Sequence, residues 1–217
     1  KRIRENCDIE IECFVQGALC VSFSGNCYFS SLVSGYSGNR GKCLQLCRKL
    51  YDFNGENKYW LSPKDLKMLN HLKDLIDAGV CSFKIEGRMR RPEYVGEAVF
   101  AYKQIIENKY YNEENLSSMY NRGDYCTAHN FNPTENIIFP NIQGHMGKKV
   151  GKVVALKNKK AIMSCCLKKG DAVKFITNNK ETGTALISET GKETTYLGNV
   201  YQNSEVRLTT DKDLIDE

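Results

Sequence analysis

One change of pattern along the chain constrains its fold more than any other feature. Before residue 116 the sequence mixes strand-like runs with two helix-length apolar stripes, whereas after residue 146 it holds only short strand-like runs. Helical stripes repeat every 3.6 residues and strand patterns every two, so the change marks a boundary between two kinds of structure. We therefore predict an α/β part followed by an all-β part.

The first part, residues 1–116, alternates strands and helices. Strands are predicted over residues 9–15 and 80–85, where apolar side chains alternate or cluster. A helix is predicted over 62–79, because Ser62-Pro63 supplies an N-cap and a first-turn proline, and a second helix begins at Pro92. This order is typical of a parallel α/β sheet or barrel.

The second part contains short strands separated by turns. Residues 117–145 are rich in turn signals and are expected to form a linker. The predicted strands that follow cover residues 150–156, 161–166, 172–177, 184–187 and 205–208. Their spacing predicts that residues 146–217 form a small β-barrel or sandwich domain.

Charge and cysteine content narrow the class of protein. The net charge of +5 permits an anionic partner without requiring one. No apolar run reaches the ~18–20 residues that a membrane helix needs, so no membrane span is expected. Ten cysteines in 217 residues, without a secretion signal, suggest thiols in a reducing compartment, and we expect a cytoplasmic protein. The start at Lys1 is interpreted as a cut inside a longer protein.

Four of the cysteines lie in or beside a glycine-rich loop over residues 18–47, and a fifth opens the next predicted strand. These residues are Cys20, Cys27, Cys43, Cys47 and Cys81. Cys20 follows the C-terminal end of a strand, which is where α/β folds place their chemistry. Four thiolates fit an iron–sulfur cluster or zinc, and glycines let backbone N–H groups approach sulfur. The alternative is that they are free cysteines that only pack.

The motifs around these cysteines resemble those of the collagenase-like peptidase family U32. The resemblance rests on residues 12–20, 24–31, 35–43 and 47–48, with a second motif over 83–95 and later landmarks near Gly123 and His145. It covers about residues 9–171. It implies that residues 1–116 are the C-terminal portion of a TIM-like (β/α) barrel whose N-terminal half is missing from this chain.

The resemblance also implies two kinds of activity. Members include collagenase-like peptidases and proteins that hydroxylate transfer or ribosomal RNA, some with a four-iron–four-sulfur cluster. By motif position, the implied ligands are Cys20, Cys27, Cys43 and Cys81, with Cys47 as the alternate for one of them. Zinc or no metal is the alternative, and prephenate is implied as a co-substrate.

Further candidate residues surround the cysteines. Glu86, Arg88 and Glu12 are the candidate catalytic groups, although a salt bridge to a nearby arginine would also account for the glutamates. The candidate groups for binding RNA or an acidic substrate are Arg40, Arg48, Lys84 and Arg90. A solvated charged rim would look the same.

The hypothesis drawn from the sequence is iron–sulfur-dependent hydroxylation of an RNA base, with RNA as partner. The first alternative is a peptidase acting on a protein or peptide, and the second is a non-catalytic binding module. No His-Glu-x-x-His or Gly-x-Ser-x-Gly motif is present. His71, His129 and His145 could each be an ordinary surface or packing residue.

Overall fold

A mixed four-stranded sheet forms the centre of the first part. The computed structural model describes residues 1–88 and 90–216. The sheet has the order β5-β1-β4-β6. Its strands are β1 (Glu12–Ala18), β4 (Asp65–Lys67), β5 (Ser82–Ile85) and β6 (Tyr125–Cys126). β1 runs parallel to β5 and antiparallel to β4, and β4 runs parallel to β6. A TIM barrel has only parallel strands, so the structure does not confirm the expected TIM-like barrel and shows a mixed α/β arrangement instead.

Helix α4 (Pro92–Ile106) covers one face of this sheet and begins at Pro92, as predicted. Its buried residues are Tyr94, Ala98, Ala101 and Tyr102, which pack in one core with Val15 of β1. The Tyr102 hydroxyl donates to the Val15 carbonyl at 2.6 Å and accepts from the Met68 N–H at 3.1 Å. One side chain thus joins α4, β1 and the segment after β4. The short α5 (Glu113–Met119) follows, capped by Asn112, whose side chain accepts from the N–H of Glu114.

The predicted helix over 62–79 forms only in its second half. Residues Asp65–Lys67 pair with β1 as β4, Leu69–His71 form a 3-10 turn, and α3 covers only Leu72–Asp77. Ser62 does not cap a helix, because it is fully buried and its hydroxyl accepts from Arg48 Nη1 at 3.0 Å. Pairing with β1 overrides the local capping signal here.

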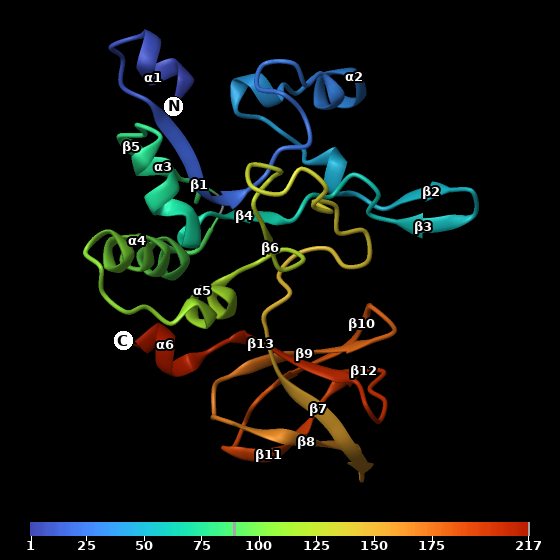
Figure 1. The fold of residues 1–217 in the computed structure, drawn as a ribbon. Coiled ribbons are helices and arrows are strands. Elements are labelled where there is room, and N and C mark those ends of the chain that lie inside the picture. Colours follow the sequence, from blue (N-terminus) through green and yellow to red (C-terminus); the bar gives the residue numbers. More distant parts are fainter. Residues whose placement is uncertain (89, 217) are drawn as a thin grey trace.

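The cysteine loop, residues 19–50, leaves the C-terminal end of β1. It contains the short helix α2 (Phe29–Ser34) and two 3-10 turns, Gly38–Arg40 and Leu46–Arg48. A two-stranded hairpin, β2 (Tyr51–Phe53) and β3 (Glu56–Lys58), extends from its end (Figure 1). The N-terminal α1 (Arg2–Asn6) precedes β1.

The β domain, predicted over residues 146–217, contains one curled antiparallel sheet over residues 148–210 in the order β11-β8-β7-β13-β9-β10-β12. The strands are β7 (Lys148–Lys157), β8 (Lys160–Leu167), β9 (Ala172–Thr177), β10 (Lys180–Leu186), β11 (Gly191–Thr195), β12 (Leu197–Gly198) and β13 (Glu205–Thr210). The five predicted strands are confirmed, and β11 and β12 were not predicted. The edge strands β11 and β12 are joined by Tyr196 alone, so the sheet curls until its two ends meet. The result is a half-barrel with a core built on Phe175, Val153 and Val206.

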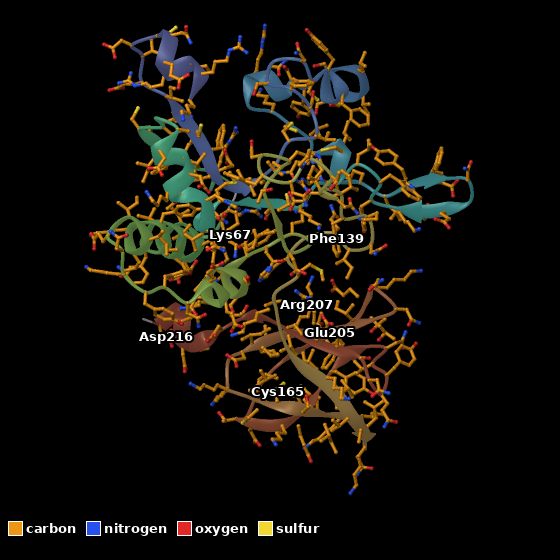
Figure 2. The ribbon with its side chains drawn as sticks, viewed as in Figure 1. Lys67, Phe139, Cys165, Glu205, Arg207 and Asp216 are labelled. Carbon is orange, nitrogen blue, oxygen red and sulfur yellow. The ribbon has the colours of Figure 1, made fainter. Side chains whose placement is uncertain are left out.

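A buried side chain, Arg207, ties the β domain to the α/β part. Arg207 of β13 donates to the Met146 carbonyl at 2.9 Å and to Asp124 Oδ1 at 2.6 Å. It lies where the two parts meet, beside Glu205 (Figure 2). Gly147 has φ +68°, and a Cβ there would come within 2.2 Å of the Leu208 carbonyl oxygen, so only glycine fits this approach.

The segment over 117–145, expected as a linker, packs against the α/β part. It contains the end of α5 and strand β6. Its backbone also bonds to the region before β4, through Lys64 N–H to the Ile137 carbonyl at 2.8 Å and Phe139 N–H to the Ser62 carbonyl at 2.9 Å. A short final helix, α6 (Lys212–Asp216), follows β13. Within the described residues, no helix has the length and apolar character needed to cross a membrane.

Candidate metal centre

The candidate site lies at the C-terminal end of β1, where the chain turns into the cysteine loop. Gly17 permits the turn, because its φ is +118° and a Cβ there would lie 2.4 Å from the carbonyl oxygen of Glu86. The loop after β1 therefore starts directly beside the loop after β5. The two parallel strands deliver Cys20 and Glu86 to the same end of the sheet.

Two sulfur atoms of the loop accept backbone hydrogen bonds. The N–H of Ser22 donates to Cys20 Sγ at 3.5 Å, and the N–H of Gln45 donates to Cys43 Sγ at 3.3 Å. Each donor lies two residues after its cysteine. Gln45 adopts φ 52°, a left-handed conformation that is uncommon for a side chain of its size. Backbone donors of this kind stabilise negative charge on a metal-bound thiolate.

Cys47 is the half-buried member of the group. Burial raises the pKa of its thiol, the charge of Arg48 lowers that pKa, and negative charge on Cys20, Cys43 and Cys27 raises it again. Cys47 is therefore near enough to the other three thiols to be affected by their charge. As thiolates they would repel, and a cationic metal or cluster between them would remove that repulsion.

Cys81 lies at the opposite end of the sheet from Cys20. It directly precedes β5, and its Sγ accepts from the N–H of Ile11, which directly precedes β1. β1 has seven residues, so roughly 20 Å of strand separates the two ends. The structure does not bring Cys81 to Cys20, Cys27 and Cys43, whereas the alternate, Cys47, lies on the same loop as those three and is affected by their charge.

The spacing of the thiols bears on which metal they suit. Within the chain that the structure describes, no three side chains of His, Cys, Asp or Glu are close enough to hold a single ion. A four-iron cluster is larger than one ion, and each of its irons takes one thiolate, so it needs its ligands further apart. Thiolates are ligands that both an iron–sulfur cluster and zinc accept.

A buried carboxylate with three arginines lies behind the cysteine loop. Asp65 is fully buried, and its Oδ2 accepts from Arg90 Nη2 at 3.1 Å, while Arg122 Nη1 lies 3.8 Å from Oδ1. Burial raises the pKa of Asp65, and the charges of Arg90, Arg122 and Arg48 oppose that rise. Burial lowers the pKa of Arg48 to about 10, so Arg48 stays charged at neutral pH. The excess positive charge favours thiolate at Cys47, the neighbour of Arg48.

Arg48 and Arg90, predicted to bind substrate, are occupied by protein partners. Arg48 Nη1 donates to the Pro63 carbonyl at 2.6 Å, and its Nη2 donates to the Leu19 carbonyl at 2.7 Å. Arg90 stacks on the ring of Tyr120, 3.6 Å from the centroid. Both side chains are buried. They hold the cysteine loop and the loop after β5 in place.

The other predicted residues divide into two groups. Arg88 Nη2 donates to the Gly41 carbonyl at 2.7 Å, two residues before Cys43, and Glu86 accepts from the N–H of Arg88 at 3.0 Å. These two lie beside the cysteine loop. Glu12 lies at the start of β1 and pairs with Lys84 at 2.9 Å on an exposed face, where hydrogen bonds from Lys84 and Ser82 lower the pKa of Glu12. The structure does not bring that pair to the cysteines.

Arg40 lines an open depression of about 460 Å³ on the cysteine loop. The other lining residues are Ser31, Gly35, Tyr36, Ser37 and Lys42. Lys42 lies 5.9 Å from the centre of the Tyr36 ring. Two cations beside an exposed aromatic ring suit an anionic ligand with a flat group, such as a nucleotide.

The histidines do not form a hydrolytic arrangement with the cysteines. His145 is partly buried, and this burial lowers its pKa to about 4. Its Nδ1 lies 3.0 Å from the N–H of Asn121, and its Nε2 lies 3.1 Å from the carbonyls of Ser118 and Thr209, so the neutral ring carries its proton on Nε2. His71 pairs with Asp74 at 3.2 Å and stacks on Phe131. His129 has φ 65° in the turn after β6.

Sequence reasoning missed Asp65, Arg122 and Tyr120 as parts of this site. The helix predicted over 62–79 would place Asp65 in its first turn, where an exposed side chain is expected. No local signal indicates that three arginines distant in sequence surround it. Cys81 differs, because a cysteine before one strand and a cysteine after a parallel neighbour must lie at opposite ends of a sheet. That signal was present in the sequence.

Comparison with known proteins gives relatives with two kinds of name. A collagenase of Porphyromonas gingivalis is 43% identical over 132 residues, which cover 53% of this chain and 37% of the relative. An uncharacterized protease of Methanocaldococcus jannaschii is 35% identical over 218 residues, covering 84% of this chain and 53% of the relative. A tRNA hydroxylation protein of Bacillus subtilis is 38% identical over 120 residues, covering 49% of this chain and 28% of the relative.

The chain therefore spans between 28% and 53% of the length of these relatives. No solved structure matches it significantly. The profile of peptidase family U32 matches residues 1–136, which include the cysteine loop, Asp65 and the loop after β5. The chain belongs to peptidase family U32.

Proposed function

We propose that this chain is the part of an RNA-modifying protein that holds an iron–sulfur cluster and that the whole protein hydroxylates an RNA base. Cys20, Cys27, Cys43 and Cys47 would be the ligands. The observation that supports the proposal is that one loop after β1 carries these four thiols, with backbone N–H groups on Cys20 and Cys43 and the charge of Arg48 beside Cys47.

The surroundings of the thiols support a cluster rather than a set of packing cysteines. Cys20 and Cys43 are exposed, and exposed thiols do not contribute to a core. The bound cluster would supply electron transfer. The chain's own contribution is to fix the loop through Arg88 and Arg48 and to place positive charge next to an anionic thiolate group.

Substrate binding is assigned to the depression around Arg40 and Lys42. Its two cations would bind a phosphate of RNA or a carboxylate of a co-substrate such as prephenate, and the Tyr36 ring offers a surface for stacking. Glu86 accepts a hydrogen bond from the N–H of Arg88, and the side chain of Arg88 contacts the cysteine loop at Gly41. Glu86 is therefore the candidate for proton transfer.

The test of the cluster compares two cysteine substitutions. After purification without oxygen, the chain is expected to contain iron and sulfide and to show the visible absorption of thiolate-bound iron. Cys47→Ser should remove most of the iron, whereas Cys81→Ser should retain it, because Cys81 lies at the other end of β1. Circular dichroism checks that both variants fold. Iron lost from Cys81→Ser and kept by Cys47→Ser would contradict this ligand set.

The test of the reaction is nucleoside mass spectrometry of transfer and ribosomal RNA. Cells that lack the full-length protein should lose a nucleoside carrying one added oxygen, and cells with the Cys20→Ser protein should lose it too. A complete set of hydroxylated nucleosides in both strains would overturn the RNA assignment. If the hydroxylated nucleoside is lost in the deletion strain but retained with the Cys20→Ser protein, the RNA reaction does not depend on the cluster.

A peptidase is the second candidate, supported by the collagenase relative. It predicts cleavage of gelatin or casein by the full-length protein that survives substitution of the loop cysteines. The partly buried, neutral His145 offers no accessible base for such a reaction, because both of its ring nitrogens face backbone groups.

A further inference from the structure

The β7–β8 hairpin of the β domain carries an unmixed positive charge. Residues 148–169 contain eight lysines and no aspartate or glutamate. The lysines are Lys148, Lys149, Lys152, Lys157, Lys159, Lys160, Lys168 and Lys169. A surface that served only solubility would mix both signs, as the rest of the chain does with 23 basic and 26 acidic residues outside this segment (31 − 8 basic, all 26 acidic).

Only the base of the hairpin is neutralised by ion pairs. Lys148 pairs with Glu114 at 2.5 Å, Lys149 pairs with Glu205 at 2.8 Å, and Lys168 pairs with Asp213. Among the described residues, the lysines toward the tip and Lys169 form no ion pair: Lys152, Lys157, Lys159, Lys160 and Lys169. The free positive charge is therefore concentrated at the end furthest from the α/β part.

Two features of the tip oppose folding. Lys157 and Lys160 are direct partners in the strand register, and like charges placed opposite each other destabilise a hairpin. Lys159 adopts φ 60° in the two-residue turn, at the position where glycine is preferred. A charged side chain occupies a site where glycine would cost less, which indicates that the charge itself is used.

The β9–β10 hairpin of the same domain provides an internal comparison. Its two-residue turn, Asn178-Asn179, has φ 51° and 59°, so the two hairpins share one turn geometry. Its charges are mixed, with Lys174 paired to Glu181 at 2.7 Å. The excess of lysine is thus a property of one hairpin and not of the domain.

The tip also lies far from the cysteine loop. In Figure 1 the two occupy opposite ends of the molecule, with the β7 arrow pointing away from α2. A small substrate cannot touch both. A partner that reaches the cysteine loop and also neutralises the hairpin must be a long polyanion, and the proposed function, on which this inference rests, supplies one in RNA.

We propose that the β7–β8 hairpin is a docking arm for the phosphate backbone of RNA. The tip lysines contact phosphates as point charges and read no sequence, since the turn offers no aromatic side chain for stacking on bases. The arm holds a folded RNA at a distance from the cysteine loop and leaves the choice of base to that loop.

The test measures binding of a transfer RNA pool to the chain by fluorescence anisotropy over a range of salt concentrations. The variant Lys157→Gln/Lys159→Gln/Lys160→Gln should bind about tenfold more weakly near physiological salt, and its log–log salt slope should fall by about two, because three phosphate contacts are lost. The matched control is Lys73→Gln/Lys109→Gln/Lys180→Gln. It removes the same number of positive charges from other parts of the surface. Its log–log salt slope should change by no more than about a third of the change expected for the hairpin variant.

Equal affinity and slope in the hairpin variant and the native chain would overturn the proposal. So would stronger binding of poly-glutamate than of RNA, which would indicate an acidic protein partner. Iron content is measured on the same preparations. Lost RNA binding with unchanged iron supports the docking arm, whereas lost iron with unchanged RNA binding in Cys47→Ser bears only on the cluster.

Discussion

The α/β part and the β domain differ in where their charged side chains lie and in what those side chains do. In the α/β part, three arginines converge on Asp65 and hold loops from distant segments together. In the β domain the core is apolar, built on Phe175, Val153 and Val206, and its unpaired charges lie outside at the hairpin tip. Charge near the cysteine loop is structural and supports the thiols, and Arg207 is structural at the junction, whereas the unpaired lysines of the hairpin tip are left for a partner. Substitutions of the buried charges should therefore affect stability, and substitutions at the tip should affect binding.

The largest effect is expected from Asp65→Asn. This change leaves three buried arginines without their carboxylate, and breaking a buried ion pair by removing one partner costs about 3–5 kcal/mol. Trp60, the single tryptophan, lies in the α/β part and reports its unfolding by fluorescence in urea. The control is Glu12→Gln at an exposed position, which should leave the midpoint of urea unfolding unchanged. A stability loss in Asp65→Asn no larger than in Glu12→Gln would remove the contrast between the two parts.

Acid should weaken the junction between the parts through His145. Burial lowers the pKa of His145 to about 4 in the folded chain, against about 6.5 when unfolded. The unfolded chain therefore binds more protons between these values, so stability falls as the pH falls from about 6.5 to 4, by on the order of 3 kcal/mol. Carboxylates also titrate there, so the measurement is the difference in pH dependence between the native chain and His145→Gln. If the free energy of unfolding depends on pH identically in both proteins, groups other than His145 cause the loss of stability in acid.

A smaller effect is expected from Arg207→Met at the same junction. The substitution leaves the Met146 carbonyl without its donor and removes the pairs with Asp124 and Glu205, whereas the Gly147 carbonyl keeps its bond from Asn121. A loss of about 2 kcal/mol follows from one buried unsatisfied group. Tryptophan fluorescence and far-ultraviolet circular dichroism should then give separate transitions for the two parts. A single shared transition would show that other contacts couple them.

The smallest effect is expected from Lys159→Gly in the hairpin turn. Glycine adopts the left-handed conformation without strain, so the β domain should gain roughly 0.5–1 kcal/mol. The same change removes one charge from the tip and should weaken RNA binding. A gain in melting temperature with a loss of affinity would sharpen the comparison, because stability and binding would move in opposite directions at one residue. Unchanged affinity for RNA would show that Lys159 takes no part in docking.

Local patterns predicted the elements whose stability is local. Pro92 at the first position of α4 and the alternation in β7, β8 and β9 act within one segment, and those elements form as expected. The helix expected from Ser62-Pro63 failed in its first half because Asp65–Lys67 gain more from pairing with β1 than from continuing a helix. Strands β11 and β12 are short, and their pairing depends on the curl of the whole sheet, which no segment contains.

The candidate site was predictable only in part for the same reason. Loop position groups Cys20, Cys27, Cys43 and Cys47 because the loop is one continuous segment beginning and ending at the same strand end. Arg48 and Arg90 were recognised as cations near the site, but their burial depends on Asp65 and Tyr120, which come from other elements. A pattern shows which charges are present, and the fold decides which of them meet solvent.

The pairing of the first and last strands of the β domain has an evolutionary consequence. Lys148 of β7 is the register partner of Leu208 of β13, so the chain enters and leaves this domain at adjacent points. A unit with adjacent ends can be inserted into a longer chain, or deleted from it, without stretching the flanking segments. Recombination can therefore exchange the docking hairpin as a cassette while the thiol-bearing part stays intact.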